Sequence, residues 1–290
     1  MPDPGFVSIV IPVFNEEEAI GDDLDLIIRT MEATDYHYEI IVVDDGSTDA
    51  SPLIVRQRSQ VRLVRHPYNR GTGAARTTGI KEAQGDVIVM TDGDGTYPNQ
   101  DIPRLLGYIH EYDMVVGARR RESGTMRWLR SPVKHAIRLL ASYLVGMRIP
   151  DLNSGFRAFK KDIVAGYLNI LPTTHSWVST ITLAFLSDGH TVKYIPIDYY
   201  PRRGRSKFRP VADTYNYLSL VARTITYFNP LQIFLPTSLI LFAFGAAKTI
   251  LDLTFHNRIR ESDVIIVVIS ILIGCIGLLA DLIVAQHRKT

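Results

Sequence analysis

Residues 40–49 read IIVVDDGSTD. Four consecutive β-branched residues are typical of a strand that is buried on both faces, and the acidic and glycine residues that follow end it. Two further stretches share this plan, because 9–17 reads IVIPVFNEE and 87–98 reads VIVMTDGDGTYP. Three apolar runs that each end in carboxylates predict a parallel sheet whose strands bring acidic side chains to one edge.

Strand-like and helix-like stretches alternate over the first 230 residues. The expected strands are 7–13, 38–44, 61–65, 86–91 and 114–118. The expected helices lie near 17–33, 49–57, 72–84 and 99–111. This alternation predicts an α/β fold with a mostly parallel, Rossmann-like sheet and helices on both faces. Ligands of such sheets bind beyond the carboxyl ends of the strands, which is where the polar motifs fall.

Two aspartates, Asp92 and Asp94, follow the strand expected at 86–91. Residues i and i+2 of an extended chain point to the same side, so these carboxylates repel each other unless a cation lies beside them. The glycine after each aspartate lets the backbone and a ligand approach closely. A divalent cation such as Mg²⁺ takes one or two carboxylates together with substrate phosphates. We therefore expect a metal site here, and an ordinary acidic turn is the alternative.

The stretch 69–76, NRGTGAAR, is similar to a dinucleotide-binding glycine pattern. Its third glycine position holds Arg76, however, and it follows the third expected strand rather than the first. Both departures exclude a dehydrogenase. A glycine-rich helix start that helps to hold a nucleotide stays open, and so does a plain loop.

The net charge of +2 hides an uneven distribution. Residues 119–138 carry seven Lys or Arg and one acid, which gives +6, and residues 202–209 carry five and no acid, which gives +5. The rest of the chain therefore sums to 2 − 11 = −9. Two basic patches on an otherwise acidic chain need an anionic partner: a nucleic acid, a phosphorylated small molecule or a membrane surface.

Two apolar stretches near the C-terminus, 231–253 and 264–285, are each long enough as helices to cross a hydrocarbon core of about 30 Å. The short segment between them predicts a transmembrane hairpin, and a buried helical pair of a soluble domain is the alternative. Basic residues flank the hairpin at both chain ends, and no secretory signal peptide is recognised. Both observations favour cytosolic termini. The single cysteine, Cys275, excludes an internal disulfide.

The expected organisation therefore has three parts. Residues 1–210 form a cytosolic α/β domain, residues 211–230 an amphipathic interfacial linker helix, and residues 231–290 the membrane hairpin. The composition supports this division, because an apolar fraction of 46% is shared between an ordinary globular domain and an apolar tail.

Taken together, these stretches resemble family-2 glycosyltransferases with the GT-A fold, and more narrowly polyprenyl-phosphate hexosyltransferases such as dolichol-phosphate mannose and glucose synthases. The matching stretches are IVIPVFNEE (9–17), IIVVDDGSTD (40–49), NRGTGAARTTG (69–79), TDGDGTYP (91–98), VVGARR (115–120), DLNSGFRAFKK (151–161) and RRGRSKF (202–208). The hairpin is similar to that of members with membrane anchors. Thr96 departs from the Gln that members often carry there. The Gln-x-x-Arg-Trp motif of processive polysaccharide synthases is absent, because Gly124 precedes Arg127 and Trp128 where that Gln would stand.

The resemblance implies transfer of one hexose, with inversion at the anomeric carbon, from a nucleotide-sugar to dolichyl or undecaprenyl phosphate. Mannose from GDP-mannose is favoured, and glucose from UDP-glucose comes next. Mg²⁺ or Mn²⁺ on Asp92 and Asp94 would neutralise the leaving diphosphate. The acceptor is a phosphate monoester with a second pKa of about 6, so it needs positioning more than a base. Asp151 is the candidate if a carboxylate assists, and the alternative for Asp151 is a pair with Arg157.

The resemblance also assigns residues to roles. The expected catalytic residues are Asp94, Arg119 and Asp151. The residues expected to bind the nucleotide-sugar are Pro12, Asn15, Glu16, Asp44, Asp45, Gly73, Arg76, Asp92, Arg202, Ser206 and Lys207. The residues expected to bind the acceptor phosphate are Arg119, Arg130 and Lys134.

Two other functions stay open: a glycosyltransferase that uses another lipid or lipid-linked saccharide as acceptor, and a non-catalytic, membrane-tethered module that binds nucleotide-sugars. No nucleic-acid partner is expected, because the basic patches lack interleaved aromatic residues. Membrane lipids are an expected partner, since a basic residue near an anionic surface contributes about 1 kcal/mol. A homo-oligomer is compatible with the sequence.

Overall fold

The computed structural model describes residues 5–120, 142, 146–174, 176–202 and 230–287. The chain divides into two compact units, Met1–Leu218 and Ser219–Thr290, and each is described by itself. The linker helix expected at 211–230 lies outside the described residues except for its last position.

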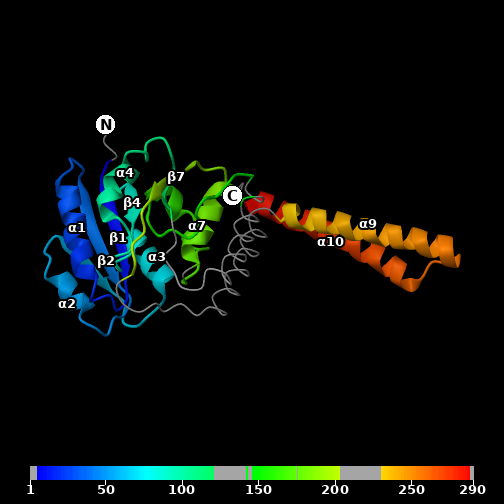
Figure 1. Cartoon of the computed structure of the whole chain (residues 1–290), viewed down its shortest axis with the longest axis horizontal. Helices are drawn as coiled ribbons and strands as arrows, with labels where there is room; N and C mark the ends of the chain where they lie inside the picture. Colours follow the sequence, from blue (N-terminus) through cyan, green and yellow to red (C-terminus); the bar gives the residue numbers. More distant parts are fainter. Residues whose placement is uncertain (1–4, 121–141, 143–145, 175, 203–229, 288–290) are drawn as a thin grey trace. The chain divides into compact units, whose positions relative to one another are not determined.

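A seven-stranded sheet forms the centre of the N-terminal unit, in the order β3-β2-β1-β4-β6-β5-β7 (Figure 1). The strands are β1 Val7–Val13, β2 Tyr38–Asp44, β3 Val61–Arg65, β4 Val87–Met90, β5 Met114–Arg119, β6 Arg157–Lys160 and β7 Val192–Ile197. β6 runs antiparallel to both of its neighbours, and all the other pairs are parallel. The predicted mostly parallel sheet is thus confirmed.

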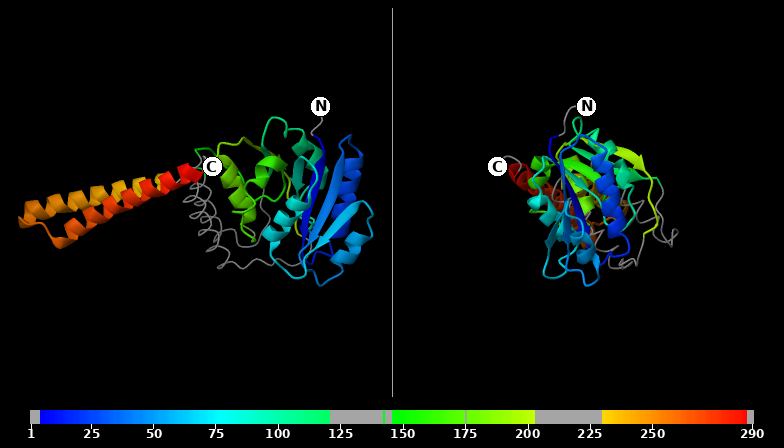
Figure 2. Two further views of the ribbon diagram at one scale, coloured as in Figure 1. Left: turned by 180° about the vertical axis from the view of Figure 1, so that it is seen from behind. Right: turned by 90° about the vertical axis from the view of Figure 1, so that its left-hand side faces the viewer.

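The helices of this unit lie on both faces of the sheet (Figure 2). They are α1 Ile20–Glu32, α2 Ser51–Arg56, α3 Thr72–Glu82, the 3-10 turn η1 Asn99–Asp101, α4 Ile102–Leu106, α6 Lys161–Ala165 and α7 Trp177–Ser187. The first three match their predictions apart from their ends. The helix expected over 99–111 is shorter, because η1 and α4 end at Leu106 and turns follow.

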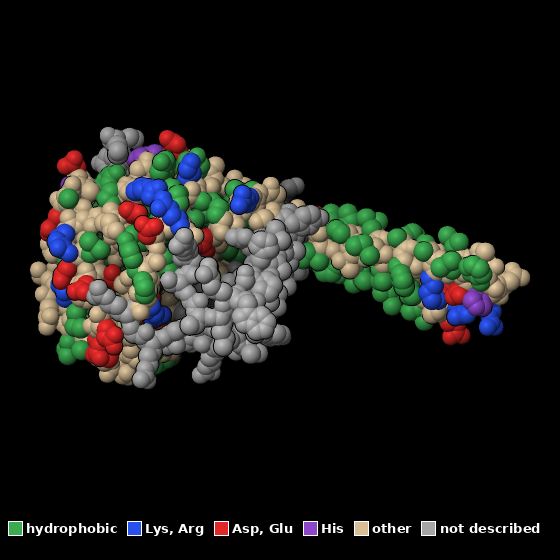
Figure 3. Space-filling model, in the orientation of Figure 1, with side chains coloured by type: hydrophobic (Ala, Val, Ile, Leu, Met, Phe, Trp, Pro, Cys, Tyr) green, Lys and Arg blue, Asp and Glu red, His purple; other side chains and the backbone are tan. Residues whose placement is uncertain are grey.

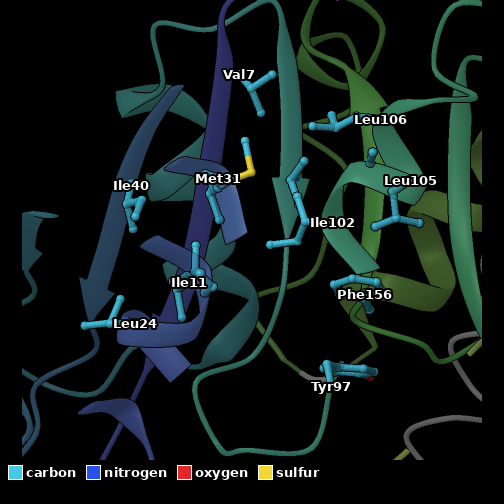
Figure 4. Packing of buried hydrophobic residues seen from close by; sticks show 14 of the residues in the cluster. Val7, Ile11, Leu24, Met31, Ile40, Tyr97, Ile102, Leu105, Leu106 and Phe156 are labelled. Carbon is cyan, nitrogen blue, oxygen red and sulfur yellow. The ribbon is translucent and has the colours of Figure 1, made fainter. Parts of the chain in front are cut away.

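Alternate side chains of β1 enter two separate cores, because successive residues of a strand point to opposite faces. Val7 and Ile11 pack with α1 and α4 through residues such as Leu24 and Ile102 (Figure 4). Val10 points to the other face and packs in the cluster that holds Trp177 of α7. All seven residues of β1 are buried, and each large aliphatic side chain buried in this way contributes roughly 1.5–3 kcal/mol.

The strand register brings three loops to one edge of the sheet. Val13, the last residue of β1, lies opposite Asp44, the last residue of β2. On the other side of β1, Val10 lies opposite Met90, where β4 ends. The segments 14–17, 45–49 and 91–96 therefore leave the sheet side by side, as the sequence predicts.

The C-terminal unit contains a hairpin of two long apolar helices, α9 Leu231–His256 and α10 Glu261–His287. Both are long and apolar enough to cross a membrane, and most of their side chains are exposed. Small residues let the helices approach closely: a Cβ on Gly277 would lie 2.4 Å from Phe234 Cβ. The predicted spans 231–253 and 264–285 lie within these helices.

The surface of the hairpin is apolar along its length, and charged side chains gather at the end where α9 meets α10 (Figure 3). There Lys248 Nζ donates to Asp252 Oδ2 at 3.1 Å and to Ser262 Oγ at 2.9 Å, and it also pairs with Asp263. This network joins the i, i+4 pair Lys248 and Asp252 of α9 to α10. The polar groups that the turn brings in thus satisfy one another.

Candidate active site

Two loops at the carboxyl edge of the sheet are bonded to each other. The Asn15 N–H donates to Ser47 Oγ at 2.9 Å, and the Thr48 N–H donates back to Asn15 Oδ1 at 2.8 Å. The Glu16 N–H donates to Ser51 Oγ at 2.9 Å. Asn15 has a φ of 52°, a left-handed conformation that Asn tolerates better than most residues. The loops after β1 and β2 are thus joined to each other, and Asn15 makes two of the hydrogen bonds between them.

Asp44 and Asp45 hold the segments around them. Asp44 Oδ1 accepts from the Ser47 N–H at 2.9 Å, and Oδ2 lies 2.9 Å from Arg65 Nε. Asp45 is buried. Its Oδ1 lies 2.7 Å from His66 Nδ1, and its Oδ2 accepts from the Gly71 N–H at 2.8 Å. These bonds show how the edge is built, and contact of either aspartate with a nucleotide stays a prediction.

The start of α3 is closed by a protein carbonyl. The Gly73 and Ala74 N–H groups both donate to Thr173 O, at 2.9 and 3.3 Å. A Cβ on Gly73 would lie only 2.3 Å from Pro172 O, so glycine is needed for this approach. Two first-turn N–H groups are therefore engaged within the protein, and contact of Gly73 with a nucleotide stays a prediction. Arg76, one turn later, donates to Asp92 in the loop that follows β4, residues 91–96, which we call the aspartate loop.

A buried network holds the loop that carries Asp92 and Asp94. Asp23 of α1 accepts from the Gly95 N–H at 2.8 Å and from Asn99 Nδ2 at 3.0 Å. Thr91 Oγ1 donates to Asn99 Oδ1 at 2.7 Å. These side chains fix the loop to the first helix, across more than 70 residues of sequence. Sequence reasoning missed Asp23 and Asn99, because their charge and polarity match an ordinary helix start.

The two aspartates of the loop have different surroundings. Asp92 Oδ1 accepts from Arg76 Nη2 at 2.8 Å. Asp94 is buried, and its Oδ1 accepts from the Thr96 hydroxyl at 2.6 Å. Burial raises the pKa of the Asp94 carboxyl, and the charge of Asp92 raises it further, whereas Thr96 and Arg202 oppose this. Thr96 thus acts as a hydrogen-bond donor to Asp94.

Arg202 connects the β1 edge to the aspartate loop. Its Nη2 pairs with Glu16 Oε1, and its Nε lies 3.5 Å from Asp94 Oδ2. The structure thus brings Arg202, Glu16 and Asp94 together, and their contact with a nucleotide stays a prediction.

Arg119 and Asp151 form a bidentate ion pair. Arg119 Nε lies 2.7 Å from Asp151 Oδ2, and Nη2 lies 2.9 Å from Oδ1. The Arg119 guanidinium also lies 5.2 Å from the centre of the Tyr199 ring. Burial works to raise the pKa of Asp151, but the hydrogen bonds and charge of Arg119 outweigh it, so the pKa is lowered.

The alternative pairing of Asp151 with Arg157 is wrong. Arg157 is fully buried and donates to Ser154 O, to Val178 O at 3.2 Å and to Thr182 Oγ1 at 2.9 Å. Burial lowers the pKa of Arg157 to about 10. Its role is therefore to hold the 153–156 turn.

That turn lies directly against the aspartate loop. A Cβ on Gly155 would lie 2.8 Å from Asp92 Oδ2, so glycine allows this contact without a shift of the carboxylate. The Gly155 N–H donates to the Tyr97 hydroxyl at 2.7 Å, and the Tyr97 ring stacks on Phe156. Burial raises the pKa of Tyr97, so its hydroxyl stays neutral. Gly155 and Tyr97 belong to matched motifs, which is the signal that could have identified them.

Several predicted residues lie outside the described residues. They are Arg130, Lys134, Ser206 and Lys207. Of the two basic patches, the structure describes only Arg119, Arg120 and Arg202. Pro12 lies in β1 opposite Val43.

A divalent cation fits the donor set of the aspartate loop. Over the described part of the chain, no cluster of three or more His, Cys, Asp or Glu side chains could by itself enclose a metal ion. Asp92 and Asp94 instead offer two carboxylates on a glycine-containing loop. Mg²⁺ is commonly held by one or two carboxylates, with water and substrate phosphates as its other ligands.

Two family models match this chain. The model described as Glycosyl transferase family 2 matches residues 8–168, and the one described as GtrB C-terminal hairpin matches residues 229–285. The first match begins at the second residue of β1, extends past β6, and includes every described residue that the sequence predicts for the site except Arg202.

Named relatives are polyprenyl-phosphate sugar transferases. The chain is 32% identical over 209 residues to a dolichyl-phosphate hexose transferase of Haloferax volcanii, which covers 71% of this chain and 88% of that protein. It is 32% identical over 167 residues to the undecaprenyl-phosphate 4-deoxy-4-formamido-L-arabinose transferase of Proteus mirabilis. That match covers 56% of this chain, which spans only 51% of the length of that relative. A dodecaprenyl-phosphate galacturonate synthase of Rhizobium johnstonii is 25% identical and covers 98% of this chain and 89% of its own.

Solved structures share the fold. Glucosyl-3-phosphoglycerate synthase of Mycobacterium tuberculosis, solved with Mn²⁺, UDP and glucosyl-3-phosphoglycerate, has a TM-score of 0.62 at 20% identity. The match covers 76% of this chain and 80% of that one. A second structure of that enzyme, with Mg²⁺ and UDP, has a TM-score of 0.62 at 19% identity and covers 76% of this chain and 79% of that one. At this level of identity the likeness shows the GT-A fold, which confirms the expected fold.

Proposed function

Because this chain belongs to glycosyltransferase family 2, we propose that it transfers one hexose from a nucleotide-sugar to a polyprenyl phosphate. The observation that carries the proposal is the carboxyl edge of the sheet, where Asp92 and Asp94 stand beside Arg76 and Arg202 in a chain that also has an apolar helical hairpin. Carboxylates suit a metal-bound diphosphate, and the hairpin suits a lipid acceptor.

The donor side of the reaction would use the aspartate loop. The bond from the anomeric carbon to the nucleoside diphosphate breaks, and the diphosphate leaves with the electron pair. A divalent cation on Asp92 and Asp94 would neutralise the charge that develops on this leaving group. Asp23 holds the loop by accepting a hydrogen bond from the Gly95 N–H, and Thr96 orients the Asp94 carboxylate.

The acceptor side would use Arg119. A phosphate oxygen of the lipid attacks the anomeric carbon, and this oxygen needs no base because the second pKa of a phosphate monoester is about 6. The ion pair with Asp151 holds the Arg119 guanidinium in one orientation, which suits the positioning of an anionic nucleophile. Asp151 accepts hydrogen bonds on both oxygens, so its contribution is to orient Arg119. Arg130 and Lys134 remain proposed partners of the same phosphate.

We also propose which sugar and which nucleotide the donor carries. The motifs favour GDP-mannose, and UDP-glucose comes second, while the relatives quoted above are named for a hexose, an aminosugar derivative and galacturonate. The proposed orientation places the catalytic domain and both termini in the cytosol, because two spans return the chain to its starting side and basic residues flank the hairpin.

The test is a transfer assay with the full chain in detergent. It offers polyprenyl phosphate, unphosphorylated polyprenol or diacylglycerol as acceptor, with Mg²⁺ and a panel of radiolabelled nucleotide-sugars. We expect labelled lipid with polyprenyl phosphate alone and with one preferred donor. Label on diacylglycerol but not on polyprenyl phosphate would assign the other acceptor class.

Matched variants make the assay specific for the aspartate loop. Asp94→Asn should lower the rate by at least about 100-fold, since the metal is worth several kcal/mol of transition-state charge. Asp162→Asn, at an exposed position of α6, should leave the rate unchanged. Full activity of the wild-type protein in excess chelator would overturn the metal role.

A further inference from the structure

Arg202 lies where two loops of the described active site bring carboxylates close to each other. Its guanidinium pairs with Glu16, which follows β1, and lies 3.5 Å from Asp94 Oδ2, which follows β4. The side chains of Glu16 and Asp94 are only 10% and 11% exposed, and that of Arg202 is 31% exposed. A cationic group is thus inserted between two nearly buried carboxylates.

The two carboxylate oxygens of Asp94 have different partners. Asp94 Oδ1 accepts from the Thr96 hydroxyl and N–H, at 2.6 and 3.2 Å, whereas Asp94 Oδ2 faces Arg202. Asp92 Oδ1 accepts from Arg76. The Asp94 oxygen that faces Arg202 is therefore the one that a metal ion would use.

The sum of the charges in the site also favours a divalent cation in the place of Arg202. Glu16, Asp92 and Asp94 carry three negative charges, and Arg76 and Arg202 carry two positive charges, so the five groups sum to −1. A divalent cation in place of Arg202 brings this sum to zero. Arginine cannot lose its proton in a protein, so a guanidinium and a metal ion on the same carboxylate oxygen repel each other. The two cations therefore compete for Asp94.

We propose that Arg202 occupies the place of the divalent cation in the donor-free protein and leaves Asp94 when the metal ion binds. Displaced from Asp94, the guanidinium is available to the diphosphate of the donor. Arg202 would thus reduce the repulsion between two nearly buried carboxylates in the donor-free protein and make strong metal binding dependent on the donor. Only the diphosphate step rests on the proposed function.

The test measures Mn²⁺ binding to the full chain in detergent, without nucleotide, by the loss of the free Mn²⁺ signal in electron paramagnetic resonance. Arg202→Gln removes the competing charge, and Arg202→Lys keeps it. Arg62→Gln is the matched control, because Arg62 also bridges two carboxylates, Glu39 and Glu82, but lies near the start of β3.

We expect Arg202→Gln to bind Mn²⁺ about two- to fivefold more tightly than the wild type, which is the size of one partly exposed ion pair. Arg202→Lys and Arg62→Gln should bind Mn²⁺ as the wild type does. Equal or weaker binding by Arg202→Gln, or no measurable binding by any variant, would overturn the proposal.

A second measurement separates competition from a general defect. With Mn²⁺ saturating, Arg202→Gln should bind GDP and UDP more weakly than the wild type, so that metal and nucleotide affinities move in opposite directions. A structural defect would weaken both. These binding results are independent of the transfer assay, so a protein with no lipid-linked product could still show the exchange, and an active enzyme could lack it.

Discussion

Arg119 and Asp151 are joined by two parallel hydrogen bonds, Nε to Oδ2 at 2.7 Å and Nη2 to Oδ1 at 2.9 Å, across 32 residues of sequence. The Asp151 side chain is 9% exposed, and its lowered pKa keeps it ionised at neutral pH. A carboxylate fixed in this way orients its arginine.

Asp151→Asn should therefore act through Arg119. We expect kcat/KM for polyprenyl phosphate to fall by roughly 10- to 100-fold, because a small misplacement of a positioning group has an effect of this size. The free energy of unfolding should fall by about 1–3 kcal/mol, since a buried charge-assisted hydrogen bond is lost. Steady-state kinetics and denaturant titration measure the two effects.

The matched control is Asp198→Asn. Asp198 pairs with Arg120 at 3.5 Å, and both side chains are more than half exposed. Such a surface pair contributes less than about 1 kcal/mol. If the control and Asp151→Asn had the same effect, the buried pair would have no special role.

The pH dependence of transfer offers a second prediction. Activity should rise with pH through about 6, where the acceptor phosphate loses its second proton. The lowered pKa of Asp151 places its own titration well below this range. The acid limb should therefore stay at the same pH in Asp151→Asn, as kcat/KM measured from pH 5 to 8 would show. Loss of this limb in the variant would instead identify Asp151 as a base.

Asp23 gives a prediction for the aspartate loop. In Asp23→Asn the amide has only one oxygen, so either the Gly95 N–H or Asn99 Nδ2 faces an N–H group instead of an acceptor. An unsatisfied buried donor costs about 1–3 kcal/mol, and we expect that loss in the free energy of unfolding. The Mg²⁺ concentration for half-maximal activity should also rise. Asp22→Asn, at the exposed neighbouring position, should change neither quantity.

Asp113 predicts how stability depends on pH. Partial burial raises its pKa, but hydrogen bonds from Lys160, at 2.8 Å, and from Thr191 lower it to about 2. Because the pKa of Asp113 is lower in the folded state, its ionised carboxylate stabilises the folded protein at pH values above the unfolded pKa of about 4. This stabilisation is lost as the pH falls toward 2. Asp113→Asn should therefore be less stable than the wild type at pH 7 by about 1–2 kcal/mol, after allowance for screening. Denaturant titrations at pH 7 and 3 should show this difference shrinking, and a constant difference would contradict the account.

The sequence predicts the carboxyl edge of the sheet well. Each carboxylate comes shortly after a strand that its own run of apolar residues predicts. The sequence does not reveal β6, whose four residues include the fully buried Arg157. That arginine is satisfied by Val178 and Thr182, which are distant in sequence, so no local pattern indicates a central strand. Helix α7 is buried on all sides and therefore shows no amphipathic period.

The ion-pair and hydrogen-bond partners within the site are also hard to predict, because they lie far apart in the sequence. Proximity in sequence favoured Arg157 for Asp151, whereas the fold supplies Arg119 from the end of β5. The network of Asp23 and Asn99 joins α1 to residues more than 70 positions later in the chain, and only the packed fold brings them together. Chemistry that is carried by neighbouring residues can be read from the sequence, and chemistry that depends on packing cannot.

The most direct test of the central claim is mass spectrometry of the lipid product. The full chain is incubated in detergent with Mg²⁺, polyprenyl phosphate and GDP-mannose or UDP-glucose in turn. The account predicts a lipid whose mass equals that of polyprenyl phosphate plus one hexose residue, formed with one of these donors and absent with Asp94→Asn. Unchanged polyprenyl phosphate with every nucleotide-sugar tried, or a lipid that carries a chain of several sugars, would contradict it.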